Sequence, residues 1–420
     1  MPTAEILSQG DEVITGQIVD SNAAWLSDRL TDLGLDVVRH TAVGDRLDDI
    51  VEVFSGARAD VIVCTGGLGP TDDDLTAEAA ARAFHRPLQF DDEAWAQIQA
   101  MFERFRRPIP DINRKQAWLP AGAARLDNPV GTAPGFAVET SRGGLLLCLP
   151  GVPHEMKRMF DDAVLPRVVE RLALRPGRLV TLHTTGIGES ALQERIEAGQ
   201  GPFRHPGVVL GYRTTPGENL VKLRASPDCS DADLAALVAL LRDRIGTPLF
   251  SVEGLPGEDG GDLIGTIARL LVERGATLAV AESCTGGLVA STCTALAGAS
   301  RWFIEGVVAY ANEAKTRHLG VDPALIAAHG AVSEPVARAM AEGLRQRSGA
   351  TFALATTGVA GPDGGTPDKP VGTVHLALAT PERTVHRLAR LGGSRARIQA
   401  HAAAGVLDLL RRHLQGIALS

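Results

Sequence analysis

Short apolar runs alternate with segments of helical periodicity through the first 171 residues. The runs that predict buried strands cover residues 4–8, 35–43, 61–65 and 145–149. The segments with apolar residues at every third or fourth position predict helices over 21–33, 47–57, 75–84, 92–106 and 153–170. Because this alternation is typical of parallel strands joined by crossover helices, we expect a doubly wound α/β domain over residues 1–171.

The pattern changes between residues 172 and 252. Strands are predicted over 178–185, 208–214 and 219–225, and helices over 190–198 and 231–245. The turn before the first of these helices should use Glu189 or Ser190 as a cap. We therefore expect a small α/β connector domain over 172–252, followed by a linker rich in Gly, Pro and acidic residues.

The remaining residues, 253–420, predict a second large α/β domain. Strands are expected over 277–281, 304–310, 351–356 and 372–379. Helices are expected over 263–274, 288–296, 314–319, 324–328, 334–347 and 394–414, with a break at 312–313 and a glycine-rich loop at 357–365. No internal repeat relates this part to the first, so the two large domains should be unrelated.

Composition excludes several classes of protein. The chain has 420 residues, 45% hydrophobic and 22% charged, which is enough for two or three buried cores. Lys and Arg number 42 against 50 Asp and Glu, and no basic run exceeds a pair, so nucleic-acid binding is not indicated. Five scattered cysteines favour reduced thiols in a cytoplasm. Neither a signal peptide nor a membrane-spanning run is visible, so we expect a soluble, cytoplasmic protein.

Three loops after strands of the first domain suit a phosphate-bearing ligand. Glycine-rich turns let backbone N–H groups approach phosphate oxygens, and the second loop, 65–76, has a Gly-Gly-x-Gly turn. The three acids Asp72–Asp74 would repel a bare phosphate, so a divalent cation between carboxylate and phosphate is one interpretation. The other is that these residues only cap the next helix, although one cap would suffice.

The stretch 277–296 predicts a strand, a small hydroxyl-rich turn and a helix. It places Ser283 and Cys284 where a turn either presents a nucleophile or holds an anion. A serine needs a base, and Lys315, five residues after Tyr310, could lose its proton if shielded from water, with the tyrosine hydroxyl as relay. The alternatives are a solvated surface lysine and, for Cys284, either a rival nucleophile or a small buried thiol.

Several long motifs in one order give the chain a resemblance to full-length members of the CinA (competence- and damage-inducible protein A) family. The first domain resembles a molybdopterin-binding-like domain through residues 16–22, 65–76, 113–116, 128–136 and 149–156. The last domain resembles the nicotinamide-nucleotide amidases through residues 281–287, 306–310, 329–333, 357–363 and 369–373, together with Asn312 and Lys315.

The resemblance implies that the last domain hydrolyses the carboxamide of nicotinamide mononucleotide, releasing ammonia and nicotinate mononucleotide. By matching position, the nucleophile would be Ser283, and Tyr310 and Lys315 would transfer protons. An oxyanion would be held by N–H groups of the glycine-rich turn. The expected substrate-binding residues are Thr285, Gly286, Gly287, Thr357, Gly358 and Arg395.

For the first domain, the resemblance implies cleavage of ADP-ribose to AMP and ribose 5-phosphate with a divalent metal, Mg, Mn or Co. The expected metal residues are Asp74 and Glu12. The expected phosphate-binding residues are Gly66, Gly67, Gly69, Thr71, Asn22, Gly131 and Thr132. A homodimer is expected from the same resemblance. Two alternatives are a first domain that only binds a nucleotide or pterin, and a scaffold for DNA uptake, which the acidic balance disfavours.

The chain departs from the family pattern at two places. Where the family usually has Gly-Thr-Glu after the first strand, this chain has Gly10-Asp11-Glu12. Where the family commonly has Gly-Asp-Arg and a further Arg, this chain has Gly393-Ser394-Arg395 and then Gln399. The first departure concerns metal preference, and the second concerns substrate affinity in the last domain.

Overall fold

The computed structural model describes residues 2–175, 177–198, 203–215 and 217–418. The chain separates into two compact units, residues 1–177 and residues 178–420, and each is described by itself. The second unit holds both the connector and the last sheet, so the division at residue 252 stays a prediction.

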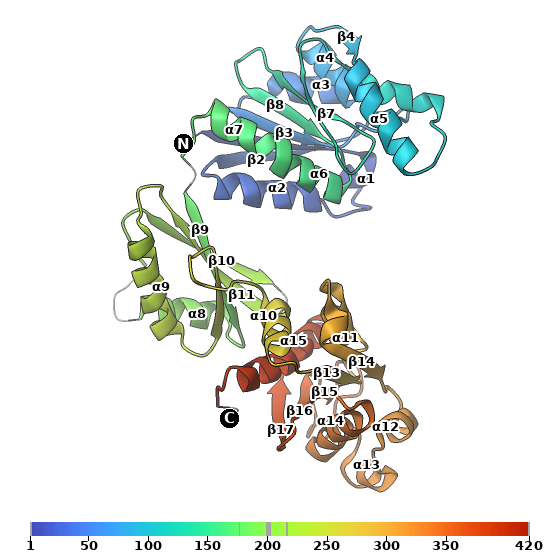
Figure 1. Ribbon diagram of the computed structural model, residues 1–420, viewed down its shortest axis with the longest axis vertical. Helices are drawn as coiled ribbons and strands as arrows, with labels where there is room; N and C mark the ends of the chain where they lie inside the picture. The colour runs from blue at the N-terminus through green and yellow to red at the C-terminus, as the bar shows by residue number, and fades with distance from the viewer. Residues whose placement is uncertain (1, 176, 199–202, 216, 419–420) are drawn as a thin grey trace. The chain divides into compact units, whose positions relative to one another are not determined.

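The first unit is built on a six-stranded mixed sheet with strand order β2-β1-β3-β8-β7-β6 (Figure 1). Its four parallel strands are β1 (Thr3–Gln9), β2 (Asp36–Val43), β3 (Val61–Thr65) and β8 (Leu145–Leu149). At one side, β7 (Gly135–Glu139) pairs antiparallel with β8, and β6 (Ala124–Leu126) pairs antiparallel with β7. The doubly wound α/β prediction is confirmed, but β6 and β7 were not predicted because they are short and flanked by Gly and Pro.

Helices cover both faces of this sheet. One face carries α2 (Ser21–Asp32), α6 (Pro153–Met159) and α7 (Leu165–Arg171), and the other carries α3 (Leu47–Gly56) and α4 (Thr76–Ala83). A π-helical segment, Phe160–Val164, interrupts the single helix expected over 153–170. The smaller elements are α1 (Asp11–Ile14), α5 (Asp92–Arg104), η1 (Asp111–Ala117), β4 (Leu88–Phe90) and β5 (Trp118–Pro120).

The second unit begins with a four-stranded antiparallel sheet in the order β10-β11-β9-β12. Its strands are β9 (Arg178–Thr185), β10 (Val208–Thr215), β11 (Glu218–Ala225) and β12 (Leu249–Glu253). Helices α8 (Glu189–Glu197) and α9 (Asp231–Ile245) cover it. Gly188 is the N-cap of α8 without a side-chain hydrogen bond, so the expected cap by Glu189 or Ser190 is wrong.

A five-stranded sheet in the order β14-β13-β15-β16-β17 follows. Its strands are β13 (Leu278–Glu282), β14 (Phe303–Val308), β15 (Phe352–Gly358), β16 (Thr373–Ala379) and β17 (Thr384–Arg390). The parallel trio β14-β13-β15 presents its carboxyl ends at one edge. Thr357 and Gly358 end β15 rather than lying in a loop, and β17 was not predicted because Thr, His and Arg interrupt its apolar pattern.

Two helical layers cover this sheet because successive strand residues face opposite ways. Val280 and Leu354 pack under α10 (Leu263–Glu273) and α15 (Arg395–Leu414), whereas Ala281 and Ala355 pack under α14 (Glu334–Ser348). The other helices are α11 (Leu288–Ala295), η3 (Ala299–Arg301), α12 (Asn312–Leu319) and α13 (Pro323–His329). Helix α12 begins at Asn312, where a break was expected.

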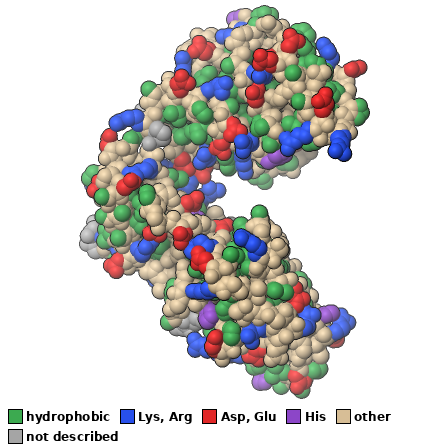
Figure 2. Space-filling view, viewed as in Figure 1, with side chains coloured by type: hydrophobic (Ala, Val, Ile, Leu, Met, Phe, Trp, Pro, Cys, Tyr) green, Lys and Arg blue, Asp and Glu red, His purple; other side chains and the backbone are tan. Residues whose placement is uncertain are grey.

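The surface mixes both signs of charge. Figure 2 shows Lys and Arg side chains interspersed with Asp and Glu over the face in view, which agrees with the absence of basic runs in the sequence. No helix among the described residues is both long and apolar enough to cross a membrane.

Helices α12 and α14 approach closely at Gly343. A Cβ atom at this position would lie 1.7 Å from the carbonyl oxygen of Leu319, the last residue of α12. The close approach therefore requires glycine in the middle of α14, despite the poor helix propensity of this residue.

We predict that Gly343→Ala destabilises the protein by about 1–3 kcal/mol, because the added methyl must push α12 away. Urea-induced unfolding measures the change. The matched control is Gly56→Ala at the end of α3, where an added Cβ meets no atom within 4 Å, and its midpoint should not fall. Equal midpoints for the two variants would contradict the packing argument.

Candidate active site

The turn after β13 places Ser283 at the carboxyl edge of the parallel strands. All five residues of β13 are buried, and the Ser283 N–H donates to the Thr356 carbonyl at 3.0 Å, which extends the β13–β15 pairing by one residue. Gly286 and Gly287 then take positive φ values of 65° and 100°, which glycine adopts without strain. The chain thereby reverses into α11, and the Ser283 side chain stays largely buried.

Glu282 fixes the turn from beneath, although the sequence analysis did not identify it. This side chain is 1% exposed, and its carboxylate accepts hydrogen bonds from the N–H groups of Gly287 at 3.1 Å, Val289 at 3.0 Å and Ala290 at 2.8 Å. A carboxylate at a helix N-terminus is favoured by both the unpaired N–H groups and the helix dipole. An acid ending an apolar strand before a glycine turn is the sequence signal that could have found it.

Lys315, in α12, reaches the nucleophile candidate directly. Its side chain is 1% exposed, and its Nζ lies 3.1 Å from Ser283 Oγ, 3.0 Å from the Ala309 carbonyl and 3.0 Å from the Tyr310 carbonyl. Burial lowers the pKa of Lys315 from its ordinary value, while negative charge on a Cys284 thiolate, where it forms, and on Glu313 opposes this shift. The alternative of a solvated surface lysine is therefore wrong.

The carbonyl contacts determine what a neutral Lys315 would do. Two N–H bonds of a neutral amine would satisfy the two carbonyls, and its lone pair would face the Ser283 hydroxyl. The arrangement is that of a nucleophile and a general base within hydrogen-bond reach.

Tyr310 does not stand between Lys315 and Ser283. Its side chain is 59% exposed, and its hydroxyl accepts a hydrogen bond from Arg395 Nη2 at 2.9 Å. Arg395 Nη1 also donates to the Gly361 carbonyl at 2.8 Å. The tyrosine-to-lysine proton relay proposed from the sequence is not formed in this structure, because only the Tyr310 carbonyl contacts Lys315.

Not all N–H groups of the glycine turn are free to hold an oxyanion. Gly286 N–H donates to the Ser283 carbonyl at 3.1 Å, and Gly287 N–H donates to Glu282. The N–H groups of Cys284 and Thr285 are therefore the candidates in this turn. Gln399 Nε2 donates to the Cys284 carbonyl at 2.8 Å. This contact fixes the orientation of the peptide group that joins Cys284 to Thr285, and with it the Thr285 N–H.

The Cys284 thiol is a poor nucleophile here. Its side chain is buried, and burial raises its pKa from 9.0 to about 11, so it stays protonated near neutral pH. Of the two nucleophile candidates left open by the sequence, Ser283 is the one that has a base beside it.

Thr357 and Gly358 lie at the end of β15 beside this turn. Thr357 is 1% exposed, and its Oγ1 donates to the Ala331 carbonyl at 2.8 Å, which ties β15 to the segment before α14. A Cβ at Gly358 would lie 2.8 Å from the Thr373 carbonyl, so close strand packing requires glycine. Thr285 lies on the opposite side of β15, with its Oγ1 2.7 Å from Thr356 Oγ1.

In the first unit, Asp74 organises the glycine-rich loop. Its carboxylate accepts from Gly69 N–H at 2.7 Å, from Thr71 N–H at 2.8 Å and from Thr71 Oγ1 at 2.6 Å. Helix α4 begins at Thr76 with no side-chain cap, so the interpretation that Asp72–Asp74 cap it is wrong. A cavity of about 230 Å³ adjoins the loop and is lined in part by Gly67, Gly69, Asp74 and Lys115.

Other residues expected to bind phosphate lie around the ends of the parallel strands. Asn22 Nδ2 donates to the Gly151 carbonyl at 2.7 Å, whereas its buried Oδ1 has no partner among the described residues. Gly66 N–H donates to the Leu149 carbonyl. Gly131 N–H donates to Asn128 Oδ1 at 2.8 Å, and Thr132, next to it, is half-buried.

The expected metal residues do not form a metal centre by themselves. Glu12 is an exposed residue of α1, and its carboxylate folds back toward Gly10. No group of three or more His, Cys, Asp or Glu side chains able to hold a metal occurs in the part of the chain that the structure describes. A resident metal ion does not fit this donor set, and a divalent cation would need ligand phosphate oxygens to complete its coordination.

Comparisons with known proteins extend over both units. Residues 261–414 match the family described as "CinA C-terminal domain", and residues 5–170 match "Probable molybdopterin binding domain". A CinA-like protein of Anaeromyxobacter dehalogenans is 45% identical over 414 residues, which are 98% of this chain and 99% of that protein. A CinA-like protein of Geobacter metallireducens is 44% identical over 420 residues, 99% of each chain. A crystal structure of CinA from Thermoplasma acidophilum is 34% identical and covers 39% of this chain and 97% of that one, with a TM-score of 0.37.

Proposed function

Because the chain belongs to the CinA family, we propose that its last domain is a serine amidohydrolase that converts nicotinamide mononucleotide to nicotinate mononucleotide and ammonia. The observation that carries the proposal is the 3.1 Å contact between the buried Lys315 amine and Ser283 Oγ. A buried lysine beside a serine hydroxyl, with no carboxylate of the described residues paired to it, supports general-base activation of that hydroxyl.

The proposed reaction uses Lys315 twice. Ser283 Oγ forms a bond to the carboxamide carbon while its proton passes to Lys315 Nζ, and the N–H groups of Cys284 and Thr285 receive the developing oxyanion. The C–N bond breaks as Lys315 returns this proton to the leaving nitrogen, which departs as ammonia. Lys315 then takes a proton from water as the water attacks the acyl ester, and the proton returns to Ser283 Oγ as nicotinate mononucleotide leaves.

The exposed groups near the turn supply a place for the nucleotide phosphate. Arg395 is exposed, carries a positive charge, and is oriented by its contacts with Tyr310 and Gly361. Gln399 replaces the arginine common in the family, but it is engaged with the Cys284 carbonyl. We assign phosphate binding to Arg395 and orientation of the turn to Gln399.

The first unit supports a second part of the proposal, the binding and cleavage of ADP-ribose. Its support is the glycine-rich loop whose N–H groups are bonded to Asp74, and the buried Oδ1 of Asn22, which has no partner among the described residues. When bound with the pyrophosphate, a divalent cation would supply charge neutralisation. Asp74 keeps the Gly69 and Thr71 N–H groups in place, so its role is first to shape the phosphate loop.

Ser283→Ala should lower ammonia release from nicotinamide mononucleotide by on the order of 10³-fold or more, because no other activated nucleophile replaces Oγ. Cys284→Ala serves as the matched control and should keep most of the activity, since its thiol is protonated. Activity that survives in Ser283→Ala but vanishes in Cys284→Ala would reverse the assignment of the nucleophile.

The rate of deamidation should rise with pH and then level off, because only the neutral form of Lys315 accepts the serine proton. The lowered pKa of Lys315 places this rise below the range of an ordinary lysine. Measuring kcat/KM across pH for wild type and for Lys315→Arg tests this, since the guanidinium stays protonated and should be inactive. A pH-independent rate, or an active arginine variant, would exclude Lys315 as the base.

For the first unit, release of AMP from ADP-ribose should require Mg, Mn or Co and should fall at least tenfold in Asp74→Asn, on the order of one lost charged hydrogen bond. Asp72→Asn is the matched control and should keep most of the activity, because the hydrogen bonds from Gly69 and Thr71 described above go to Asp74. Binding of ADP-ribose by calorimetry without AMP release under any of these metals would favour the binding-module alternative.

A further inference from the structure

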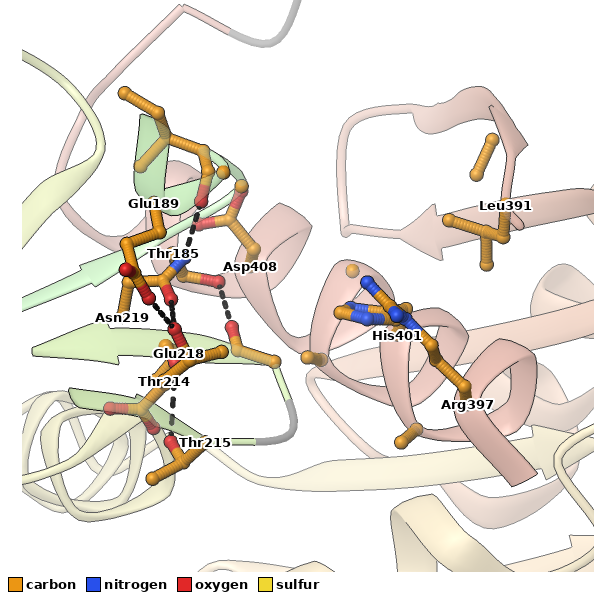
Figure 3. Close-up of a pocket in the computed structure, with 18 of the residues that line it drawn as sticks. Thr185, Glu189, Thr214, Thr215, Glu218, Asn219, Leu391, Arg397, His401 and Asp408 are labelled. Atoms are coloured by element: carbon orange, nitrogen blue, oxygen red, sulfur yellow. Dashed lines mark hydrogen bonds between the residues drawn. The ribbon is translucent and has the colours of Figure 1, made fainter. Parts of the chain in front are cut away.

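A cavity of about 890 Å³ lies within the second unit, apart from the Ser283 turn. One wall comes from the connector, through the ends of β9, β10 and β11 and the turn entering α8, and the other comes from β16, β17 and α15 (Figure 3). Ser283, Lys315 and Tyr310 are not among its lining residues. Its size falls within the range of cavities that hold small organic ligands.

The carboxylates of this cavity are largely engaged by the protein. Asp408 is 1% exposed and accepts from Arg411 at 2.6 Å and from Arg412 at 2.9 Å. Glu218 accepts from the Leu263 N–H at 2.9 Å and lies 3.3 Å from the His183 ring. Glu189 accepts from Thr214 Oγ1 at 2.6 Å and lies on the connector wall, across from α15 in Figure 3.

Two nitrogen-bearing side chains on the α15 wall, Arg397 and His401, are not engaged in this way. Arg397 and His401 are four residues apart on one face of α15, and Figure 3 shows their side chains together, beside Leu391. Within the described part of the chain, neither side chain forms an ion pair with an acid. Burial, and secondly the positive charge of Arg397, lower the pKa of His401, so its imidazole is neutral near pH 7 and can donate a ring N–H to an anion. Among the described residues, the Arg397 guanidinium has no counter-anion.

The surroundings of this pair suit an organic group larger than a free anion. Leu376, Ala389 and Leu391 give the cavity an apolar side. On α15 the row of small residues, Ala396, Ala400 and Ala404, recurs at every fourth position and leaves the space open. A ligand with a phosphate and a nucleobase or similar ring suits these surroundings, because the guanidinium binds the phosphate and the apolar side contacts the ring.

We propose that this cavity is a binding site for a mononucleotide, with its phosphate at Arg397 and His401 and its base against the Ala389 and Leu391 side. The site is separate from the proposed amidase turn and does not depend on that activity. It also differs from the expected phosphate loops of the first unit.

Photo-crosslinking with 8-azidoadenosine 5′-monophosphate, followed by peptide mapping, tests the site on the full-length protein. We expect label on lining segments of β16, β17, α15 or the connector, and roughly tenfold less label in Arg397→Ala, in keeping with one lost charge-assisted contact. Ala400→Trp, which fills the cavity, should also lose the label. Arg142→Ala, in an exposed turn of the first unit, is the matched control and should label like the wild type.

Mapping separates this site from the others, because label at residues 283–287 or in the first unit is scored on different peptides. Label found only in those regions would overturn the proposal. Undiminished labelling of α15 and the connector in Arg397→Ala, with a native circular dichroism spectrum, would overturn it as well. Equal labelling of these segments by 8-azidoadenosine, which lacks the phosphate, would exclude the anion-binding role of Arg397.

Discussion

The burial of the Lys315 amine constrains the whole of the last domain. Removing an ammonium group from water is expensive, and here two carbonyl oxygens and one hydroxyl replace the lost water contacts. Those contacts join the turn after β13, the chain after β14 and the first turns of α12. The approach of α12 in turn depends on Gly343, because a larger residue in α14 would displace it. The burial of Lys315 therefore depends in part on the packing of α12 against α14 at Gly343, a contact that does not involve the lysine itself.

Two further polar contacts determine how the Ser283 turn can act. Glu282 engages the N–H groups at the start of α11, including that of Gly287, and Gln399 engages the Cys284 carbonyl. The turn is therefore rigid, and its available N–H groups lie close to the nucleophile itself. Helix α15 reaches the Ser283 turn through Arg395 and Gln399 and lines the separate cavity through Arg397 and His401, so one helix contributes to both the candidate active site and the proposed nucleotide cavity.

In the first unit, too, a carboxylate determines the shape of a glycine-rich loop by accepting hydrogen bonds from its N–H groups. Asp74 was interpreted from the sequence as either a metal ligand or a helix cap. The structure excludes the helix cap and shows the carboxylate bonded within its own loop, to Gly69 and Thr71. Two backbone N–H groups and one hydroxyl group donate to this carboxylate, and these three hydrogen bonds hold the loop in its shape. Any cation at this site depends on what the ligand brings, since Glu12 lies apart on α1.

The sequence by itself determined the α/β class, most helices and most buried strands, because apolar periodicity is read along the chain. It proposed Ser283, Tyr310 and Lys315 as a set only through the resemblance to a family. It did not reveal β6, β7, β12 or β17, which lack a long uninterrupted apolar run. Only the tertiary structure brought Lys315 Nζ beside Ser283 Oγ, buried the Cys284 thiol, separated the Tyr310 hydroxyl from Lys315, and placed the Glu282 carboxylate at the start of α11. These outcomes depend on burial and on contacts between residues distant in sequence, which set pKa values and hydrogen-bond partners and leave no periodic trace in the chain.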